Sequence, residues 1–201
     1  MNVDDLLLAL DVLSILICVL GFLSAYFQWK ESKNVLDIGV MMLIAVLTAS
    51  IVAQITTSVY ANYLGEDEVM PSLGYMSVID LLQLLTGFVY AWFIFFLMDW
   101  KRMYSIPLIT MYFAGLLYSQ YGIRLPFSIF SGAAVVVGSI VFFYNSIKNK
   151  NSISLALGLC GILFVLNVVL RYFGVLHTRV IIQNIGVISI ILAENGWMDE
   201  H

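Results

Sequence analysis

The chain consists of long apolar stretches separated by short polar links. A helix needs about 20 apolar residues to cross a hydrocarbon core of about 30 Å, and seven stretches meet or approach that length. They are continuously apolar and do not alternate every second residue, so they predict helices and not strands. The predicted spans run from Leu6 to Phe27, Val35 to Ser58, Tyr75 to Met98, Tyr104 to Ser119, Phe127 to Asn145, Ser152 to Phe173 and Arg179 to Ala193.

The composition indicates what surrounds these helices. Of the 201 residues, 62% are hydrophobic and 11% are charged. A water-soluble globule of this length cannot hide so much apolar side chain, so lipid is expected to be the main solvent. Acidic residues precede the first stretch where a secretory signal has basic ones, so it is interpreted as a retained helix. We therefore predict an all-α polytopic membrane protein, with residues 1–201 forming a single transmembrane helical domain.

The distribution of charge among the links predicts an orientation. The second link carries Glu66, Asp67 and Glu68, whereas the odd-numbered links carry basic side chains. Because basic residues beside short loops are retained in the cytoplasm, the odd links are predicted to be cytoplasmic. The chain would then cross the cell membrane about seven times, with its N-terminus outside the cell and its C-terminus in the cytoplasm. The basic residues of the odd links are Lys30, Lys33, Lys101, Arg102, Lys148 and Lys150.

A comparison of the chain with itself suggests an internal repeat. Without a gap, the first two spans match the fifth and sixth, so that Gly21 falls on Gly138 and Lys33-Asn34 on Lys150-Asn151. Both copies run from outside to inside and back, as parallel repeats do. Two apolar helices joined by a basic loop also match by chance, so both interpretations stay open. A true duplication would sort the helices into three, one linker and three.

The stretch KNKNSISLALGLCGILFVLNVVLRYFGVLHTRVIIQNIG contains a basic turn, a helix with a central Asn, and a Gln-Asn-Ile-Gly that enters the last span. With the 3+1+3 arrangement, it resembles the SWEET and PQ-loop superfamily of small-solute transporters, although the Pro-Gln signature is absent. The resemblance implies two triple-helix repeats around an axial substrate path. It also implies that Asn167 and Asn184 match the paired asparagines of the family's substrate pocket. Retrieval-signal receptors of the early secretory pathway share that architecture, so fold alone does not decide the function.

Polar side chains within the spans are the candidate binding residues, because they are costly in lipid and usually face a bundle interior. Those in the middle or outer half of the spans predict a polar cavity open toward the outside. Asp37, Asp99 and Glu194 lie near the inner span ends, where they are expected to meet headgroups or water. The predicted substrate-binding residues are Gln54, Asp80, Gln83, Asn167, Arg171, Gln183 and Asn184.

Each candidate also has a structural interpretation. Asp80 and Arg171 are the opposite charges at similar depth, and they either bind a ligand or form a buried ion pair that fixes helix register. The amide side chains either bind a ligand or tie helices together through hydrogen bonds. Glycines in the later spans are interpreted as contacts that let helices approach closely, and these are Gly132, Gly138, Gly158 and Gly161.

Several kinds of chemistry have no sequence support. Clustered metal ligands, a phosphate-binding glycine loop and a nucleophile elbow are absent, so neither an enzyme nor a cofactor is expected. The net charge of -4 argues against a nucleic-acid partner. The expected partners are the lipid bilayer, an unidentified small polar solute, and further copies or subunits of a membrane complex. Three functions stay open: a small-solute transporter, a seven-helix receptor or sensor, and a non-catalytic subunit of a larger complex.

Overall fold

The computed structural model describes residues 3–64, 72–172 and 178–196, and helices dominate it. A hairpin of two short strands, β1 (Ser72–Leu73) and β2 (Met76–Ser77), precedes the third helix, and a 3-10 turn, η1 (Lys101–Met103), follows it. The seven α-helices are α1 (Val3–Ser32), α2 (Val35–Leu64), α3 (Val78–Leu97), α4 (Ser105–Tyr121), α5 (Arg124–Asn149), α6 (Ser152–Tyr172) and α7 (Thr178–Glu194).

The structure confirms the all-α class and the seven predicted helices. Five helices are long and apolar enough to cross a membrane, and α7 adds a shorter apolar segment, Ile181–Glu194. The 17-residue α4 is shorter than a typical span. Several helices extend beyond the predicted spans because their polar ends continue the same backbone hydrogen bonding past the apolar stretch.

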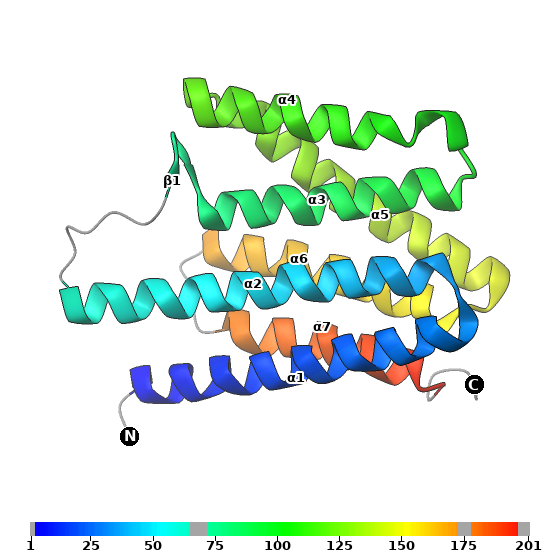
Figure 1. Cartoon of the computed structure of the whole chain (residues 1–201), viewed down its shortest axis with the longest axis horizontal. Coiled ribbons are helices and arrows are strands. Elements are labelled where there is room, and N and C mark those ends of the chain that lie inside the picture. Colours follow the sequence, from blue (N-terminus) through cyan, green and yellow to red (C-terminus); the bar gives the residue numbers. More distant parts are fainter. Residues whose placement is uncertain (1–2, 65–71, 173–177, 197–201) are drawn as a thin grey trace.

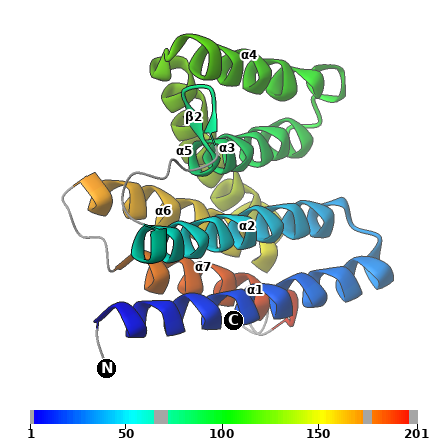
Figure 2. The same cartoon turned by 60° about the vertical axis from the view of Figure 1, so that its left-hand side comes forward.

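The helices form two layers, with α4 outside them (Figure 1). Helices α1, α2 and α3 pack side by side in chain order, and α5, α6 and α7 do the same in the second layer. Contacts of α3 with α5 and of α1 with α7 join the layers, and α4 packs on α3 and α5 at one edge (Figure 2). Consecutive helices are antiparallel, so the turns that follow α1, α3 and α5 lie at the same end of the bundle. We call it the basic end, because it carries Lys30, Lys33, Lys101, Arg102, Lys148 and Lys150.

Two of these turns have matching local structure. Lys33 and Lys150, which follow α1 and α5, both have left-handed backbone angles, with φ of 55° and 49°. In each turn the next residue is an asparagine whose Oδ1 accepts a hydrogen bond from the start of the following helix. Asn34 accepts from Leu36 N at 3.1 Å, and Asn151 accepts from Ser154 N at 3.0 Å. Both asparagines therefore satisfy a backbone donor that an α-helix leaves unpaired at its N-terminus.

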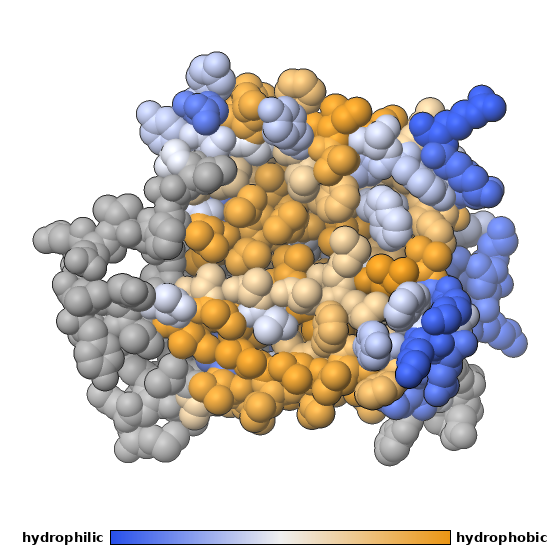
Figure 3. Space-filling view, viewed as in Figure 1, coloured by the Kyte–Doolittle hydropathy of each residue, from blue (hydrophilic) through white to orange (hydrophobic). Residues whose placement is uncertain are grey.

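The outer surface of the bundle is apolar. Figure 3 shows hydrophobic side chains over the middle of one face and hydrophilic side chains gathered at the basic end. Leu20 and Ile140, far from the ends of their helices, are each 63% exposed. An apolar surface of this extent fits lipid and not water, which supports a multi-pass membrane protein.

Glycine allows close helix packing inside the bundle. A Cβ atom added at Gly138 would lie 2.7 Å from Tyr90 Cδ1, and one added at Gly161 would lie 2.0 Å from Ser139 Oγ. A Cβ added at Gly158 would meet the ring of Phe143 at 3.2 Å. The packing role predicted for these three glycines is confirmed. The same prediction is wrong for Gly132, around which a Cβ would meet nothing within 4 Å, because it lies on the exposed face of α5.

Candidate binding site between the helix layers

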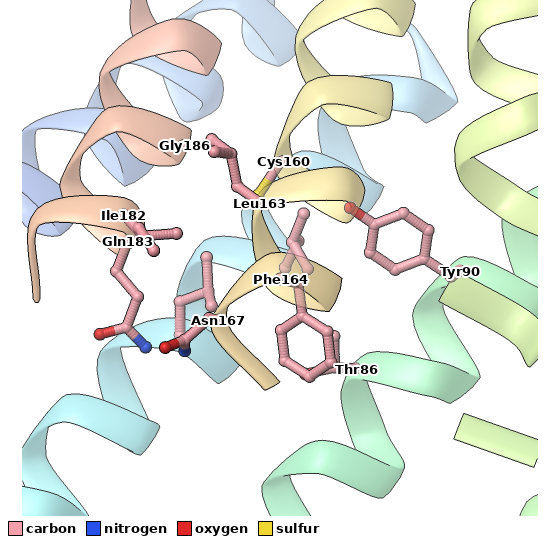
Figure 4. A pocket seen from close by; sticks show the side chains of 11 residues that line it. Thr86, Tyr90, Cys160, Leu163, Phe164, Asn167, Ile182, Gln183 and Gly186 are labelled. Atoms are coloured by element: carbon pink, nitrogen blue, oxygen red, sulfur yellow. The ribbon is translucent and has the colours of Figure 1, made fainter. Parts of the chain in front are cut away.

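A small pocket lies between the two layers, where four helices face one another (Figure 4). Its volume is about 20 Å³, which is room for about one water molecule. Helix α2 contributes two leucines, α3 contributes Thr86 and Tyr90, and α6 and α7 contribute the remaining residues. The full lining consists of Leu43, Leu47, Thr86, Tyr90, Cys160, Leu163, Phe164, Asn167, Ile182, Gln183 and Gly186.

Two amide side chains are the least satisfied polar groups of this pocket. Asn167 on α6 is 8% exposed, and Gln183 on α7 is half-buried. The carbonyl oxygens Asn167 Oδ1 and Gln183 Oε1 are buried without a hydrogen-bond partner among the described residues. Both amides line the pocket, and Figure 4 shows them pointing toward each other. An amide carbonyl buried in this way costs free energy unless a donor reaches it, so these two oxygens are available to a ligand.

The other polar side chains of the pocket already have partners. Thr86 Oγ1 donates to the carbonyl of Leu82 at 2.9 Å, within α3. Tyr90, which is 1% exposed, donates from its hydroxyl to the carbonyl of Leu157 on α6 at 3.0 Å. None of the lining residues carries a charge. The free hydrogen-bonding capacity of the pocket is therefore concentrated in the Asn167 and Gln183 amides.

Asp80 lies outside this pocket, at the N-terminus of α3. Ser77 caps the helix, accepting from Asp80 N at 3.2 Å, while Ser77 N donates back to Asp80 Oδ2 at 3.2 Å. Tyr118 donates to the same oxygen at 3.1 Å, and Arg124 lies 3.5 Å from Oδ1. These partners make Asp80 part of a capping box that connects α3, α4 and the start of α5.

The other predicted site residues are not gathered at the pocket. Gln83 is half-buried on α3 and does not line it, and Asn184 lies beside Gln183 with its own buried Oδ1 unpartnered. The side chains of Gln54 and Arg171 lie outside the described residues, so the predicted pairing of Arg171 with Asp80 stays a prediction. Of the predicted set, the structure brings Asn167 and Gln183 together in one pocket.

The basic end differs from the prediction for two carboxylates. Asp99 is exposed there as expected, with 76% of its side chain accessible. Asp37 and Glu194, predicted to meet headgroups or water, are 1% and 4% exposed. The prediction of exposed side chains is wrong because neighbouring helices cover both, although Glu194 borders a polar hollow at this end. Within residues 3–64, 72–172 and 178–196, no group of three or more His, Cys, Asp and Glu side chains could hold a metal ion.

Comparisons with known proteins found no protein-family model, no curated protein and no solved structure that matches this chain.

Proposed function

We propose that this chain is a membrane transporter for a small, neutral polar solute, and that the pocket between the two layers is its binding site. The observation that carries the proposal is the pair of unpartnered amide carbonyls, Asn167 Oδ1 and Gln183 Oε1, buried on facing helices. A hydroxyl or amide N–H of a solute would satisfy both oxygens. A charged solute fits less well, because the lining offers no opposite charge in a low-dielectric interior.

The alternative for these amides is a structural tie between α6 and α7. A tie satisfies its members, since its stabilisation comes from the hydrogen bonds that it makes. Here the carbonyl oxygens of both amides lack a protein partner among the described residues. That arrangement supports a ligand-binding role over a purely structural one.

The size of the pocket indicates which state this conformation represents. A volume of about 20 Å³ holds about one water and excludes a sugar or a polyol. A transported solute would therefore enter only when the layers separate.

As part of this proposal, the first three and the last three helices are two copies of one repeat. Two layers of three consecutive helices, with α4 at the edge, fit a 3+1+3 duplication. The aligned residues Lys33 and Lys150 share a left-handed turn, and the aligned asparagines after them cap the next helix. Two related halves around a central site are the arrangement in which transporters alternate their access. In this proposal the basic end faces the cytoplasm.

Uptake into proteoliposomes tests the proposal. The purified chain is reconstituted and assayed with labelled sugars, polyols and amides, alongside Gln183→Leu and the matched control Gln120→Leu, which removes an exposed amide on α4. We expect uptake of at least one compound by the wild type and by Gln120→Leu, and loss of uptake in Gln183→Leu. A compound that stabilises the wild type without crossing the bilayer would contradict transport and support the receptor function.

A further inference from the structure

Helices α1, α2 and α7 meet in a tight seam around Gly21. A Cβ atom added there would lie 3.2 Å from Ile191 Cγ1 on α7 and 3.2 Å from Ile44 Cδ1 on α2. A side chain at this position would meet both isoleucines at less than ordinary van der Waals distance, so the glycine favours the close approach of both helices to α1. The seam continues toward the basic end, where Ala25, one turn further along α1, is fully buried.

Two carboxylates lie on this seam near the basic end. Asp37 precedes Ile44 by seven residues on α2, and Glu194 follows Ile191 by three residues on α7. Separations of three and seven residues return to the same face of a helix, so both residues continue the faces that meet at Gly21. Asp37 is 1% exposed and Glu194 is 4% exposed, which places both within the seam.

Most of their oxygen atoms lack a partner. Ser32 Oγ donates to Asp37 Oδ2 at 2.6 Å, but Asp37 Oδ1, Glu194 Oε1 and Glu194 Oε2 are buried without a hydrogen-bond partner among the described residues. The hydroxyl of Ser24 on α1 lies beside Glu194 and accepts a hydrogen bond of 3.4 Å from Asn195 Nδ2. The Ser24 hydroxyl is near enough to lower the pKa of Glu194 in part, but neither Glu194 oxygen accepts a hydrogen bond of ordinary length among the described residues, so this buried carboxylate is poorly satisfied as an anion.

Among the described residues, no basic side chain neutralises the two carboxylates. The ion pairs among the described residues join Lys101 with Asp99 and Arg124 with Asp80, and neither involves the seam. Lys150 borders the same surface hollow as Glu194 but is itself exposed. The charged side chains at the nearby helix ends are all exposed, and they are Lys30, Glu31, Lys33, Lys148 and Lys150.

Two buried carboxylates without a counter-charge cannot both stay ionised, because the burial of each charge is costly and the two repel each other. We propose that Asp37 and Glu194 form a proton-binding site, in which the two carboxyl groups together carry one proton at neutral pH. Binding converts a carboxylate and a proton from solvent into a neutral carboxyl group, so the pair keeps one negative charge.

The position of Glu194 also gives protons access. It is the last residue of α7, beyond the predicted span, and borders a polar hollow of about 590 Å³ with Gln28 and Asn195 at the basic end. Burial raises the pKa of Glu194 from 4.5 to about 7; the Ser24 hydroxyl opposes this rise, and the neighbouring Asp37 charge adds to it. Proton binding itself does not depend on the proposed transport. A coupling of proton binding to solute transport, through α7, would rest on the proposed function.

The test is the pH dependence of thermal unfolding of the purified full chain, compared with Glu194→Gln. A raised pKa in the folded state makes the folded protein bind more protons than the unfolded chain between about pH 4.5 and pH 7, so stability falls as pH rises through this window. Glutamine imitates the protonated carboxyl group. We expect equal Tm values for both proteins at the acidic end, and a Tm higher by a few degrees for Glu194→Gln above about pH 7.

Further variants and a change of salt test whether the pH dependence arises from the Asp37 and Glu194 pair. Asp37→Asn should reduce the pH-dependent loss, because it removes the neighbouring charge, whereas the exposed control Asp99→Asn should follow the wild type. Tm curves of wild type and Glu194→Gln that run parallel across the whole range would overturn the proposal. If sodium chloride, but not choline chloride, stabilises the wild type above pH 7 and leaves Glu194→Gln unchanged, the site holds a sodium ion, which also overturns it. None of these readouts uses a solute, so failure here is distinct from failure of the transport proposal.

Discussion

Tyr118 of α4 donates a hydrogen bond of 3.1 Å to Asp80 Oδ2 on α3, the same oxygen that accepts from Ser77 Oγ at 2.8 Å. Arg124, the first residue of α5, approaches the other oxygen at 3.5 Å. Asp80 is therefore the point at which three consecutive helices are joined, at the end of the bundle opposite the basic end. These contacts give Asp80 a structural role, whereas the sequence analysis placed it among the candidate binding residues.

The two partners of Asp80 should contribute unequally to stability. Tyr118 is buried, so Tyr118→Phe removes a hydrogen bond to a carboxylate and should lower the free energy of unfolding by about 1.5 to 3 kcal/mol. The Arg124 side chain is 64% exposed, so Arg124→Gln should cost less than about 1 kcal/mol. Denaturant unfolding in detergent measures both. A cost for Arg124→Gln equal to that of Tyr118→Phe would contradict the assignment of Tyr118 as the main partner.

Contact between α3 and α5 should depend on the absence of a side chain at Gly87. A Cβ atom there would lie 2.7 Å from the backbone Cα of Ser131, which cannot rotate away. We expect Gly87→Ala to lower the free energy of unfolding by about 1 to 3 kcal/mol. Gly132→Ala is the matched control on α5, where a Cβ meets nothing within 4 Å, and it should be neutral or stabilising. Equal losses for the two variants would contradict the close α3–α5 contact.

The proposed orientation predicts opposite labelling of two exposed sites. Gln120 lies at the end of α4 opposite the basic end, and Asn149 lies at the basic end of α5. In intact cells, an impermeant thiol reagent should label Gln120→Cys and leave Asn149→Cys unlabelled. The native cysteines, Cys18 and Cys160, are buried and should give a low background in both variants. Labelling of Asn149→Cys alone would reverse the orientation.

The helices were predictable because seven apolar stretches leave few alternatives in lipid. The start of the third helix was less predictable. The apolar stretch begins at Tyr75, but the helix begins at Val78, after the short hairpin. The pattern Ser-x-x-Asp from Ser77 to Asp80 is a capping signature, and this signal in the sequence is sufficient to place Asp80 at a helix end.

The candidate sites were predictable only in part, because depth along a span does not specify the face of a helix. Gln183 and Asn184 have nearly the same depth, yet successive residues on a helix point about 100° apart, and Gln183 is the one that lines the pocket. The burial of Asp37 and Glu194 depends on α2 and α7 meeting across α1 at Gly21, which no local pattern indicates. Tyr90 is one of many aromatic residues in the spans, and nothing in the sequence predicts that its hydroxyl would donate to the Leu157 carbonyl on α6.

The most direct test of the proposed function is a ligand-dependent shift in thermal stability of the purified protein. A panel of neutral sugars, polyols and amides is compared with amino acids and short peptides, for wild type, Asn167→Leu and the exposed control Asn149→Leu. A bound solute stabilises the folded state in proportion to the logarithm of its concentration over Kd. We predict that at least one neutral polar compound raises the Tm of the wild type and of Asn149→Leu and leaves Asn167→Leu unchanged. A compound that stabilises all three proteins alike, or a panel without any effect, would contradict a solute site at the Asn167 and Gln183 amides.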